Sequence, residues 1–417
     1  MFPSLARVLL TDVVVVGGGP AGAAAATTLA RSGRQVVLVD RATFPRDKSC
    51  GDGLTTAALR LLHRLGRDPG DVATWLPVDD VHLVGPDGRG AVFPLPRDQG
   101  MYAAVAKRVD LDAAVLDLAR SAGVRVLDGH ACTGASGHDD RVVVEVEGVG
   151  EVHARYGVAA DGMWSPVRRF LGADTPGYRG EWHAFRQYFS GVDTAASRAF
   201  WIWFEADLNP GYLWSFPLPD GRANVGFGIQ RGGAVRTREM ARLWPELLQR
   251  PGIREVLGPD ATPDAPHRAW PIPAAIDRAL LTSGRFLFAG DAAMAADPMT
   301  GEGIGQALIT GIRAAEAIEA GGPYRHLAVG RTYDATVRSD LEANHRIAVL
   351  LVRALGHPLG VRAALRAAGA NDWTRRNFAR WLFEDYPRAA VVTPRHWHRG
   401  RFTGPGVRFE APVEVAG

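Results

Sequence analysis

A glycine-rich turn near the start of the chain restricts the fold more than any other feature. Residues 12–16, DVVVV, form an apolar β-branched run, and GGGPAG leads from it into an alanine-rich stretch of helical character. Gly17, Gly19 and Gly22 have GxGxxG spacing, which permits a tight turn and lets backbone amides and a helix N-terminus approach a pyrophosphate. Strand, turn and helix together predict a dinucleotide-binding unit.

The second strand of this unit ends in an acidic residue. QVVLVD, at 35–40, is another apolar run, and Asp40 and Arg41 stand at its end. A carboxylate at this place hydrogen-bonds a ribose hydroxyl in dinucleotide folds. We therefore expect Asp40 and Arg41 to contact the cofactor. The extended pattern argues against a glycine turn that serves packing alone.

Length and composition indicate one large globular enzyme. A chain of 417 residues fits two or three packed units, and its 47% hydrophobic and 22% charged residues exclude disordered and fibrous classes. The net charge of +3 is too small to indicate nucleic-acid binding. The two cysteines, Cys50 and Cys132, form neither a disulfide framework nor a zinc-ligand spacing, so we expect no metal.

Membrane-spanning and secretory signals do not stand out in the sequence. The opening MFPSLARVLLTD lacks the pattern of a signal peptide, and no uninterrupted apolar run approaches the ~20 residues of a bilayer span. We expect a cytoplasmic protein with at most peripheral membrane contact. The basic, aliphatic stretch at 345–366 is the candidate for contact with anionic lipid, and an ordinary amphipathic packing helix is the alternative.

The rest of the chain changes character twice. Residues 105–121 have helical periodicity, whereas aromatic runs separated by turn signals between 176 and 275 predict an antiparallel sheet. A short buried strand at 285–290 and a helix at 301–321 then predict that the chain returns to the first unit. From residue 323 onward the chain is helical and rich in arginine.

Two later segments favour FAD over a nicotinamide cofactor. ADG at 160–162, which contains Asp161, resembles the Asp-Gly motif of flavoprotein hydroxylases. FAGDA at 288–292, which contains Gly290 and Asp291, resembles their Gly-Asp motif. Together with the glycine turn, and in the same order along the chain, these motifs imply FAD. We expect FAD to be bound non-covalently, because no histidine or cysteine stands at a recognisable attachment motif.

The resemblance also implies how the flavin is held. Asp291 hydrogen-bonds the ribityl chain, and Gly301, Gly303 and Ile304 begin a helix that faces the pyrimidine edge of the flavin. A helix dipole there stabilises the negative charge of reduced flavin. Arg108 matches an arginine that contacts the cofactor, and the alternative is a solvated arginine at the start of a helix.

Three further segments resemble the geranylgeranyl reductase family, whose members saturate prenyl double bonds. They are FPRDKSCGDGL at 44–54, GYLWSFPLP at 211–219 with a Tyr-x-Trp-x-Phe-Pro pattern, and DPMTGEGI at 297–304, which includes Pro298. The resemblance implies hydride transfer from reduced flavin N5 plus protonation, with NADPH, NADH or a ferredoxin-like donor as reductant. The spacing of the proline before the tyrosine is shorter than the usual family form.

By the same resemblance, Tyr212, Trp214 and Phe216 line a tunnel that binds the prenyl chain, and Tyr212 and Trp214 are catalytic candidates. Aromatic walls suit a polyisoprenoid, which offers only apolar surface, although such residues also fill ordinary cores. Cys50 and Gly51 lie beside the isoalloxazine, where the Cys50 thiol shields N5 or donates a proton. A small buried hydrophobe is the alternative for Cys50.

The implied architecture is an α/β fold of the p-hydroxybenzoate hydroxylase type. A Rossmann-like FAD-binding domain is interrupted by an antiparallel β-sheet substrate domain and followed by a helical C-terminal region. The expected boundaries are 1–78, 102–175 and 277–322 for the FAD-binding domain, 79–101 and 176–276 for the substrate domain, and 323–417 for the C-terminal region.

Other functions use the same cofactor motifs. An FAD-dependent monooxygenase, acting through a flavin C4a-hydroperoxide on an apolar or aromatic substrate, is the main alternative. A halogenase is disfavoured, because WIWFE at 201–205 matches only part of the Trp-x-Trp-x-Ile-Pro motif. A flavin-binding carrier without turnover is a further alternative. We expect a prenyl-containing small-molecule or lipid partner and a monomer or small homo-oligomer.

Overall fold

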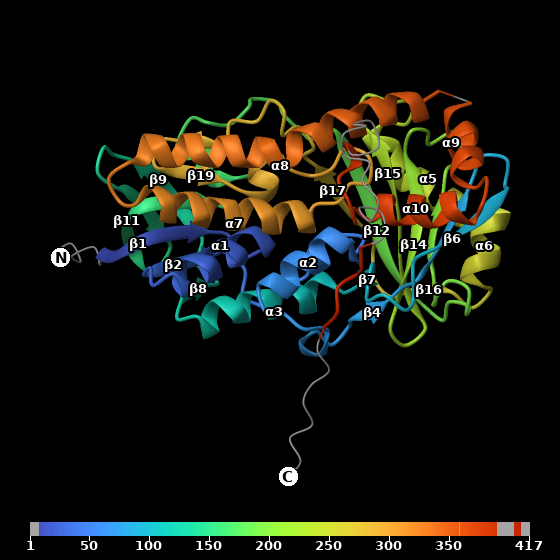
Figure 1. Cartoon of the computed structure of the whole chain (residues 1–417), viewed down its shortest axis with the longest axis horizontal. Coiled ribbons are helices and arrows are strands. Elements are labelled where there is room, and N and C mark those ends of the chain that lie inside the picture. Colours follow the sequence, from blue (N-terminus) through green and yellow to red (C-terminus); the bar gives the residue numbers. More distant parts are fainter. Residues whose placement is uncertain (1–7, 358, 390–403, 410–417) are drawn as a thin grey trace, which may run out of the picture.

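Two large β-sheets lie side by side in the structure (Figure 1). This computed structural model describes residues 8–357, 359–389 and 404–409. The long helix α8 (His326–Leu355) runs along the first half and reaches the second, where Val352 packs among Trp182 and Ala274. The two halves therefore share a continuous outer layer.

The first sheet is built around β1 (Val8–Val16), which pairs in parallel with β2 (Val36–Asp40) and β11 (Gly150–Ala159). Its order is β18-β19-β11-β1-β2-β8, with β10 and β9 attached beside β11. The valines at 13–16 are buried, as expected for a central parallel strand covered on both faces. The other strands are β8 (Arg125–Asp128), β9 (Cys132–Gly137), β10 (Val142–Val146), β18 (Thr282–Ser283) and β19 (Phe286–Phe288).

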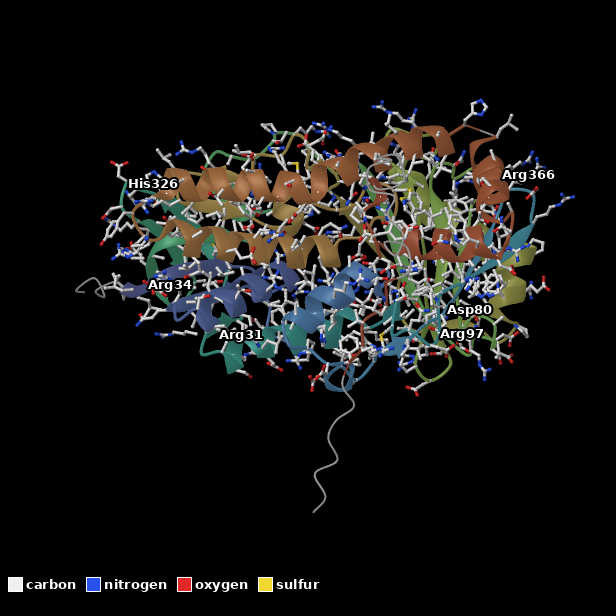
Figure 2. The ribbon with its side chains drawn as sticks, viewed as in Figure 1. Arg31, Arg34, Asp80, Arg97, His326 and Arg366 are labelled. Carbon is white, nitrogen blue, oxygen red and sulfur yellow. The ribbon has the colours of Figure 1, made fainter. Side chains whose placement is uncertain are left out.

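Helices cover this sheet. α1 (Pro20–Arg31) packs against α3 (Arg108–Ser121) and α7 (Ile304–Gly321), and α8 covers α7. α2 (Thr56–Arg64) also contacts α7, and α4 (Pro166–Phe170) follows β11. Ion pairs at the periphery join these elements. For example, Arg34 of the α1–β2 turn pairs with Glu319 of α7, with 2.8 Å between Arg34 Nε and Glu319 Oε1. Figure 2 labels Arg34 at this edge of the molecule.

The second sheet has the order β16-β12-β15-β14-β13-β5-β6, and β17 pairs with β12. All its pairs are antiparallel except that of β5 with β13. The strands are β5 (Asp80–Val84), β6 (Gly90–Pro94), β12 (Trp182–Ser190), β13 (Phe200–Trp203), β14 (Tyr212–Leu218), β15 (Arg222–Gln230), β16 (Thr262–Pro263) and β17 (Arg268–Ile272).

The two faces of the second sheet have different neighbours. Helices α5 (Met240–Leu248) and α6 (Pro251–Leu257) pack on one face, where the rings of Trp244 and Phe227 stack with centroids 5.6 Å apart. Side chains alternate between faces along a strand, so the odd and even positions of β14 and β15 point to opposite sides. The face away from α5 is free to line a site.

Smaller elements connect the halves. A three-stranded sheet contains β3 (Gly53–Leu54), β4 (Leu76–Pro77) and β7 (Ala104–Val105), and α9 (Gly360–Ala368) leads to α10 (Asp372–Leu382), which packs on β6. The 3-10 helices are η1 (Pro69–Asp71), η2 (Thr237–Glu239) and η3 (Gly290–Ala293).

Within the described ranges, no single helix has the length and hydropathy of a bilayer span. Only α8 and α9 taken together meet that criterion, and they form a pair bent by 115°.

Candidate active site

A single cavity of about 1170 Å³ extends from the glycine turn after β1 to the C-terminal helices. Most residues predicted to bind cofactor or substrate line it: Gly17, Gly19, Asp40, Arg41, Cys50, Gly51, Arg108, Asp161, Tyr212, Trp214, Phe216, Gly290, Asp291, Gly301, Gly303 and Ile304. Gly22 and Pro298, which we also expected at the cofactor, lie outside this lining. The structure thus brings together segments from both ends of the sequence.

The glycine turn needs glycine for close approach. Gly17 has a φ of +106°, and a Cβ there would lie 2.2 Å from the carbonyl oxygen of Ala160. A Cβ on Gly22 would lie 1.8 Å from the carbonyl oxygen of Gly17, so Gly22 allows α1 to pack against the turn. Gly22 therefore shapes the cofactor cradle without facing it.

Charged groups flank the turn. Asp40 accepts hydrogen bonds from the backbone N–H of Gly18 (2.6 Å) and of Ala42 (2.8 Å), which fixes its carboxylate at the cavity wall. The Arg46 guanidinium lies 3.4 Å from the Cβ position of Gly19, and its Nη1 is 3.1 Å from Asp112 Oδ2. A cation beside the N-terminus of α1 suits a pyrophosphate.

Asp161 lines the cavity and has one carboxylate oxygen without a hydrogen-bond partner in the described part of the chain. Its Oδ2 accepts from the backbone N–H of Val167 (3.0 Å), whereas its Oδ1 is buried without a hydrogen-bond partner among the described residues. Burial raises the pKa of Asp161 to about 6. A buried oxygen without a partner and a turn that admits only glycine both fit FAD: a hydroxyl group of the cofactor would donate to Asp161 Oδ1, and its pyrophosphate would lie against the backbone of the turn.

Asp291 lies near Lys48, a partly buried lysine to which the sequence analysis assigned no role. Lys48 Nζ is 3.7 Å from Asp291 Oδ2 and 4.1 Å from the centre of the Trp270 ring. Burial lowers the pKa of Lys48, and the charge of Asp291 opposes this effect. The pair brings a carboxylate and an ammonium to the place where we expect the ribityl chain.

Arg108 is buried and paired, which excludes the solvated alternative. Its Nε and Nη2 donate to the two carboxylate oxygens of Asp112 at 2.7 and 2.8 Å. It is also close enough to Cys50 for its charge to oppose the burial that raises the pKa of the Cys50 thiol. Arg108 thus supports the wall of the cavity beside Cys50.

A hydrogen-bond network fixes the Cys50 segment to the second sheet. Asn224 of β15 donates from Nδ2 to the carbonyl oxygen of Cys50 (2.8 Å) and to Asp52 Oδ2 (2.7 Å), and it accepts from Trp214 Nε1 (3.2 Å). The Tyr188 hydroxyl also donates to Asp52 Oδ2 (2.7 Å). Burial raises the pKa of Asp52 to about 6. The network joins the two halves at the site.

The aromatic residues of β14 form a wall. Tyr212, Trp214 and Phe216 share one face of the strand, with successive ring centroids 6.0 and 6.2 Å apart. A Cβ on Gly51 would lie 3.2 Å from the Phe216 ring, and the Tyr212 hydroxyl donates to the carbonyl oxygen of Thr300. The wall therefore contacts both segments that we expect to surround the flavin.

The far end of the cavity comes from the C-terminal helices, for which the sequence suggested no role at the site. Its apolar side chains are Leu351, Val352 and Leu355 of α8, Val361, Ala364 and Leu365 of α9, and Phe378, Trp381 and Leu382 of α10. Apolar spacing in these helices was the available signal, but it does not distinguish a cavity wall from a core.

Comparison with known proteins identifies the family. Residues 10–315 match the FAD binding domain family. A menaquinone reductase of Mycobacterium tuberculosis is 35% identical over 322 residues, which cover 70% of this chain and 72% of that protein. A digeranylgeranylglycerophospholipid reductase of Methanothrix thermoacetophila is 31% identical over 323 residues, covering 74% and 77%. The chain belongs to the geranylgeranyl reductase family.

A solved structure confirms the predicted fold of this geranylgeranyl reductase family member. The geranylgeranyl bacteriochlorophyll reductase-like protein of Thermoplasma acidophilum superposes with a TM-score of 0.74 over 91% of this chain and 92% of that chain, at 21% identity. The predicted FAD-dependent oxidoreductase class is confirmed as well. Arg46, Lys48, Asp52 and Asn224 also belong to the family member's site. The first three lie in the segment at 44–54 that carries the family resemblance, and Asn224 follows the Tyr-x-Trp-x-Phe-Pro segment, but the sequence assigned none of the four a role.

Proposed function

We propose that this protein saturates carbon-carbon double bonds of a prenyl chain carried by a lipid or a quinone. The observation that carries the proposal is the continuity of the cavity, which joins the flavin cradle to an apolar, aromatic end. Its volume of about 1170 Å³ exceeds the roughly 300–1,000 Å³ of ordinary ligand pockets. Such a cavity suits a cofactor and a long apolar substrate held end to end.

The chain's own residues supply orientation and exclusion of water. Bound FAD, when reduced, supplies the hydride. The β14 wall offers flat apolar surfaces to a substrate without polar groups, and Asn224 holds Cys50 and Gly51 against that wall. The N-terminus of α7, at Ile304, would stabilise negative charge on a flavin bound beside it. The names of the two reductases similar in sequence support a prenylated substrate.

An anaerobic product assay tests this function. The reduced protein, mixed without oxygen with a geranylgeranyl lipid or with menaquinone, should yield a prenyl chain that has gained two hydrogens for each bond saturated, as measured by mass spectrometry. Product that forms only when oxygen is present, with an added oxygen atom, would instead establish the monooxygenase alternative.

A steric variant locates the substrate. Ala364→Trp places a large ring in the apolar end of the cavity, whereas Ala367→Trp places the same ring on the exposed side of α9. We expect the first variant to lose activity on long prenyl chains while it keeps bound FAD, and the second to behave as wild type. Equal activity of both variants on long chains would contradict this substrate path.

The electron donor is NADPH, NADH or a ferredoxin-like protein in our proposal, binding transiently at the FAD-binding half. Anaerobic loss of oxidised-flavin absorbance on mixing with each donor distinguishes them. A protein that none of these donors reduces, and that dithionite does reduce, would contradict the proposed donors.

Peripheral contact with an anionic membrane is the proposed route of substrate entry. Leu350, Leu359 and Trp373 are exposed around the helices that close the cavity, and arginines accompany them on α8 and α9. Figure 2 shows His326 and Arg366 at the two ends of the edge that these helices form. The wild-type protein should sediment with phosphatidylglycerol vesicles at low salt, and a double variant with Leu350→Asp and Trp373→Asp should stay in the supernatant. Wild-type protein that does not sediment with the vesicles would contradict this proposal.

A further inference from the structure

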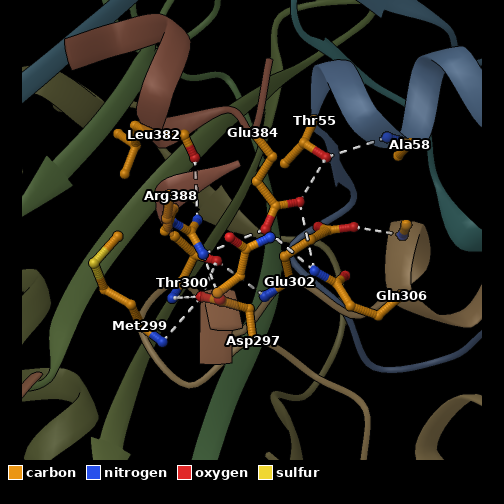
Figure 3. Close-up of polar contacts among 12 residues, drawn as sticks. Thr55, Ala58, Asp297, Met299, Thr300, Glu302, Gln306, Leu382, Glu384 and Arg388 are labelled. Atoms are coloured by element: carbon orange, nitrogen blue, oxygen red, sulfur yellow. Dashed lines mark hydrogen bonds and ion pairs between the residues drawn. The ribbon is translucent and has the colours of Figure 1, made fainter. Parts of the chain in front are cut away.

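A group of three carboxyls and one guanidinium surrounds the start of α7 (Figure 3); Asp297 and Arg388 are buried, and Glu302 and Glu384 are partly buried. Asp297 and Glu302 come from the loop before this helix, and Glu384 and Arg388 come from the segment after α10. Glu302 lines the cavity, and it stands two residues after Thr300, whose carbonyl oxygen accepts the Tyr212 hydrogen bond. The group therefore adjoins the aromatic wall.

Asp297 and Arg388 form the fixed part of the group. Asp297 Oδ1 accepts from the backbone N–H groups of Met299 (3.0 Å) and Thr300 (2.8 Å), and its Oδ2 accepts from Arg388 Nη1. Arg388 is 1% exposed, and its Nη1 also lies 3.3 Å from Glu384 Oε1. This one cation is matched by Asp297, and little positive charge remains for the other two carboxyls.

Glu302 and Glu384 form the second part. Glu302 Oε1 accepts from the backbone N–H of Gly305 at 2.7 Å. Glu384 Oε1 accepts from Gln306 Nε2 (3.2 Å), and its Oε2 accepts from the Thr55 hydroxyl (3.4 Å). Glu384 has a φ of +56°, a conformation that non-glycine residues rarely adopt and that often accompanies function.

The surroundings of this second part favour retention of a proton. Arg388 is shared between Asp297 and Glu384, and Figure 3 shows Glu302 beside Glu384, so the two glutamates have less than one full positive charge to balance them. Burial, and then the charge of Glu384, raise the pKa of Glu302 well above its usual range. Burial also raises the pKa of Glu384, against the charge of Arg388.

We propose that Glu302 and Glu384 share one proton at neutral pH and that Glu302 donates this proton in the reduction proposed above. One alkene carbon accepts the hydride with its electron pair, the π electrons form the second C–H bond with the Glu302 proton, and oxidised flavin and a Glu302 carboxylate remain. The carboxylate regains a proton through Glu384 and solvent. Glu302 is the catalytic residue, and Glu384 positions and shares its proton.

Other titratable groups face Glu302 from neighbouring elements and must be separated from it. They are Asp297 on its own loop, Glu384 after α10, Tyr212 on β14 and Cys50 on the loop after β2. Burial raises the pKa of both Cys50 and Tyr212, so each would lose its proton at higher pH than usual. Variants at these positions therefore give different pH profiles.

Infrared spectroscopy tests the shared proton without turnover. Wild-type protein should lose a protonated-carboxyl band between neutral and alkaline pH, and Glu302→Gln should lack that change. Glu316→Gln is the matched control, because Glu316 lies on α7 but pairs with Arg64 and Arg313 instead. Absence of a titrating carboxyl band in the wild type would overturn the inference even if the protein saturates prenyl chains.

Transient kinetics tests proton donation. The reduced FAD-bound protein is mixed anaerobically with geranylgeranyl diphosphate or menaquinone across pH. Glu302→Gln should slow flavin oxidation by about 100-fold or more and remove the alkaline decline. Glu384→Gln should move that decline to lower pH, because it removes a charge that raises the Glu302 pKa.

Wild-type rates and an unmoved pH profile in both Glu variants would overturn proton donation. Loss of the alkaline decline in Cys50→Ala or Tyr212→Phe would overturn it as well. If Glu302→Gln fails to fold, the Glu384→Gln profile decides. A wild-type protein that saturates no prenyl substrate refutes the proposed function, whereas the infrared result still decides whether the proton is shared.

Discussion

Replacing Asn224 by leucine should destabilise the protein through the network that joins the two halves. Asn224 is fully buried, and its side chain makes three hydrogen bonds, to the carbonyl oxygen of Cys50 (2.8 Å), to Asp52 (2.7 Å) and from Trp214 (3.2 Å). Leucine makes none of them, and it leaves the Trp214 N–H buried without an acceptor. Each loss costs about 1–3 kcal/mol, so we expect a loss of about 3–5 kcal/mol in the free energy of unfolding.

The loss should depend on pH, with a sign that the Asp52 carboxyl determines. Burial raises the pKa of Asp52 to about 6, and the Asn224 hydrogen bond acts to lower it. A carboxyl with a raised pKa in the fold stabilises the folded state at low pH, and that stability disappears as the pH rises through the folded pKa. Leucine raises the pKa of Asp52 further, so the variant should lose more stability near pH 8 than near pH 5.

Urea denaturation of the FAD-bound protein, followed by circular dichroism, measures the effect. Asn377→Leu is the matched control, because Asn377 donates one hydrogen bond, to the carbonyl oxygen of Trp373 (2.9 Å), on an exposed part of α10. We expect the control to change stability by less than about 1 kcal/mol. An Asn224→Leu variant that matches this control, or whose loss is the same at both pH values, would refute the reasoning.

Three further changes test other parts of the site. Gly22→Ala should abolish FAD binding, because its Cβ would lie 1.8 Å from a backbone oxygen. Gly252→Ala is the control and should retain the flavin spectrum, because no described atom lies within 4 Å of its Cβ position. Arg388→Met should destabilise the fold by about 3–5 kcal/mol at pH 8, because it leaves the carboxylates of Asp297 and Glu384 without their cation. The loss, measured by thermal denaturation, should be smaller at acidic pH, where protonation removes the charge of these carboxyls. Tyr212→Phe should keep the flavin oxidation rate within about tenfold of wild type, because its hydroxyl bonds a backbone carbonyl; stopped-flow traces that show a larger loss would contradict this.

The sequence predicted the cofactor-binding segments because their signals are local. Gly17, Gly19 and Asp40 lie within one strand-turn-helix-strand unit, whose spacing is visible without the fold. The contact of Asn224 with Cys50 could not be predicted in this way, because the two residues lie 174 positions apart and the residues around Asn224 do not indicate its partner. Glu384 likewise meets Gln306 only after α7 and the last helices have packed. Pairings of this kind depend on tertiary structure, which periodicity does not encode.

The segment after α10 constrains how such a protein can diversify. Exchanging the terminal helices would be a simple route to substrates of another length, because they form the apolar end of the cavity and leave the flavin cradle untouched. The same stretch of chain also delivers Glu384 and Arg388 to the start of α7. Any engineered or evolved replacement must therefore keep these two side chains in place while it reshapes the pocket, so that substrate range and proton chemistry are inherited together.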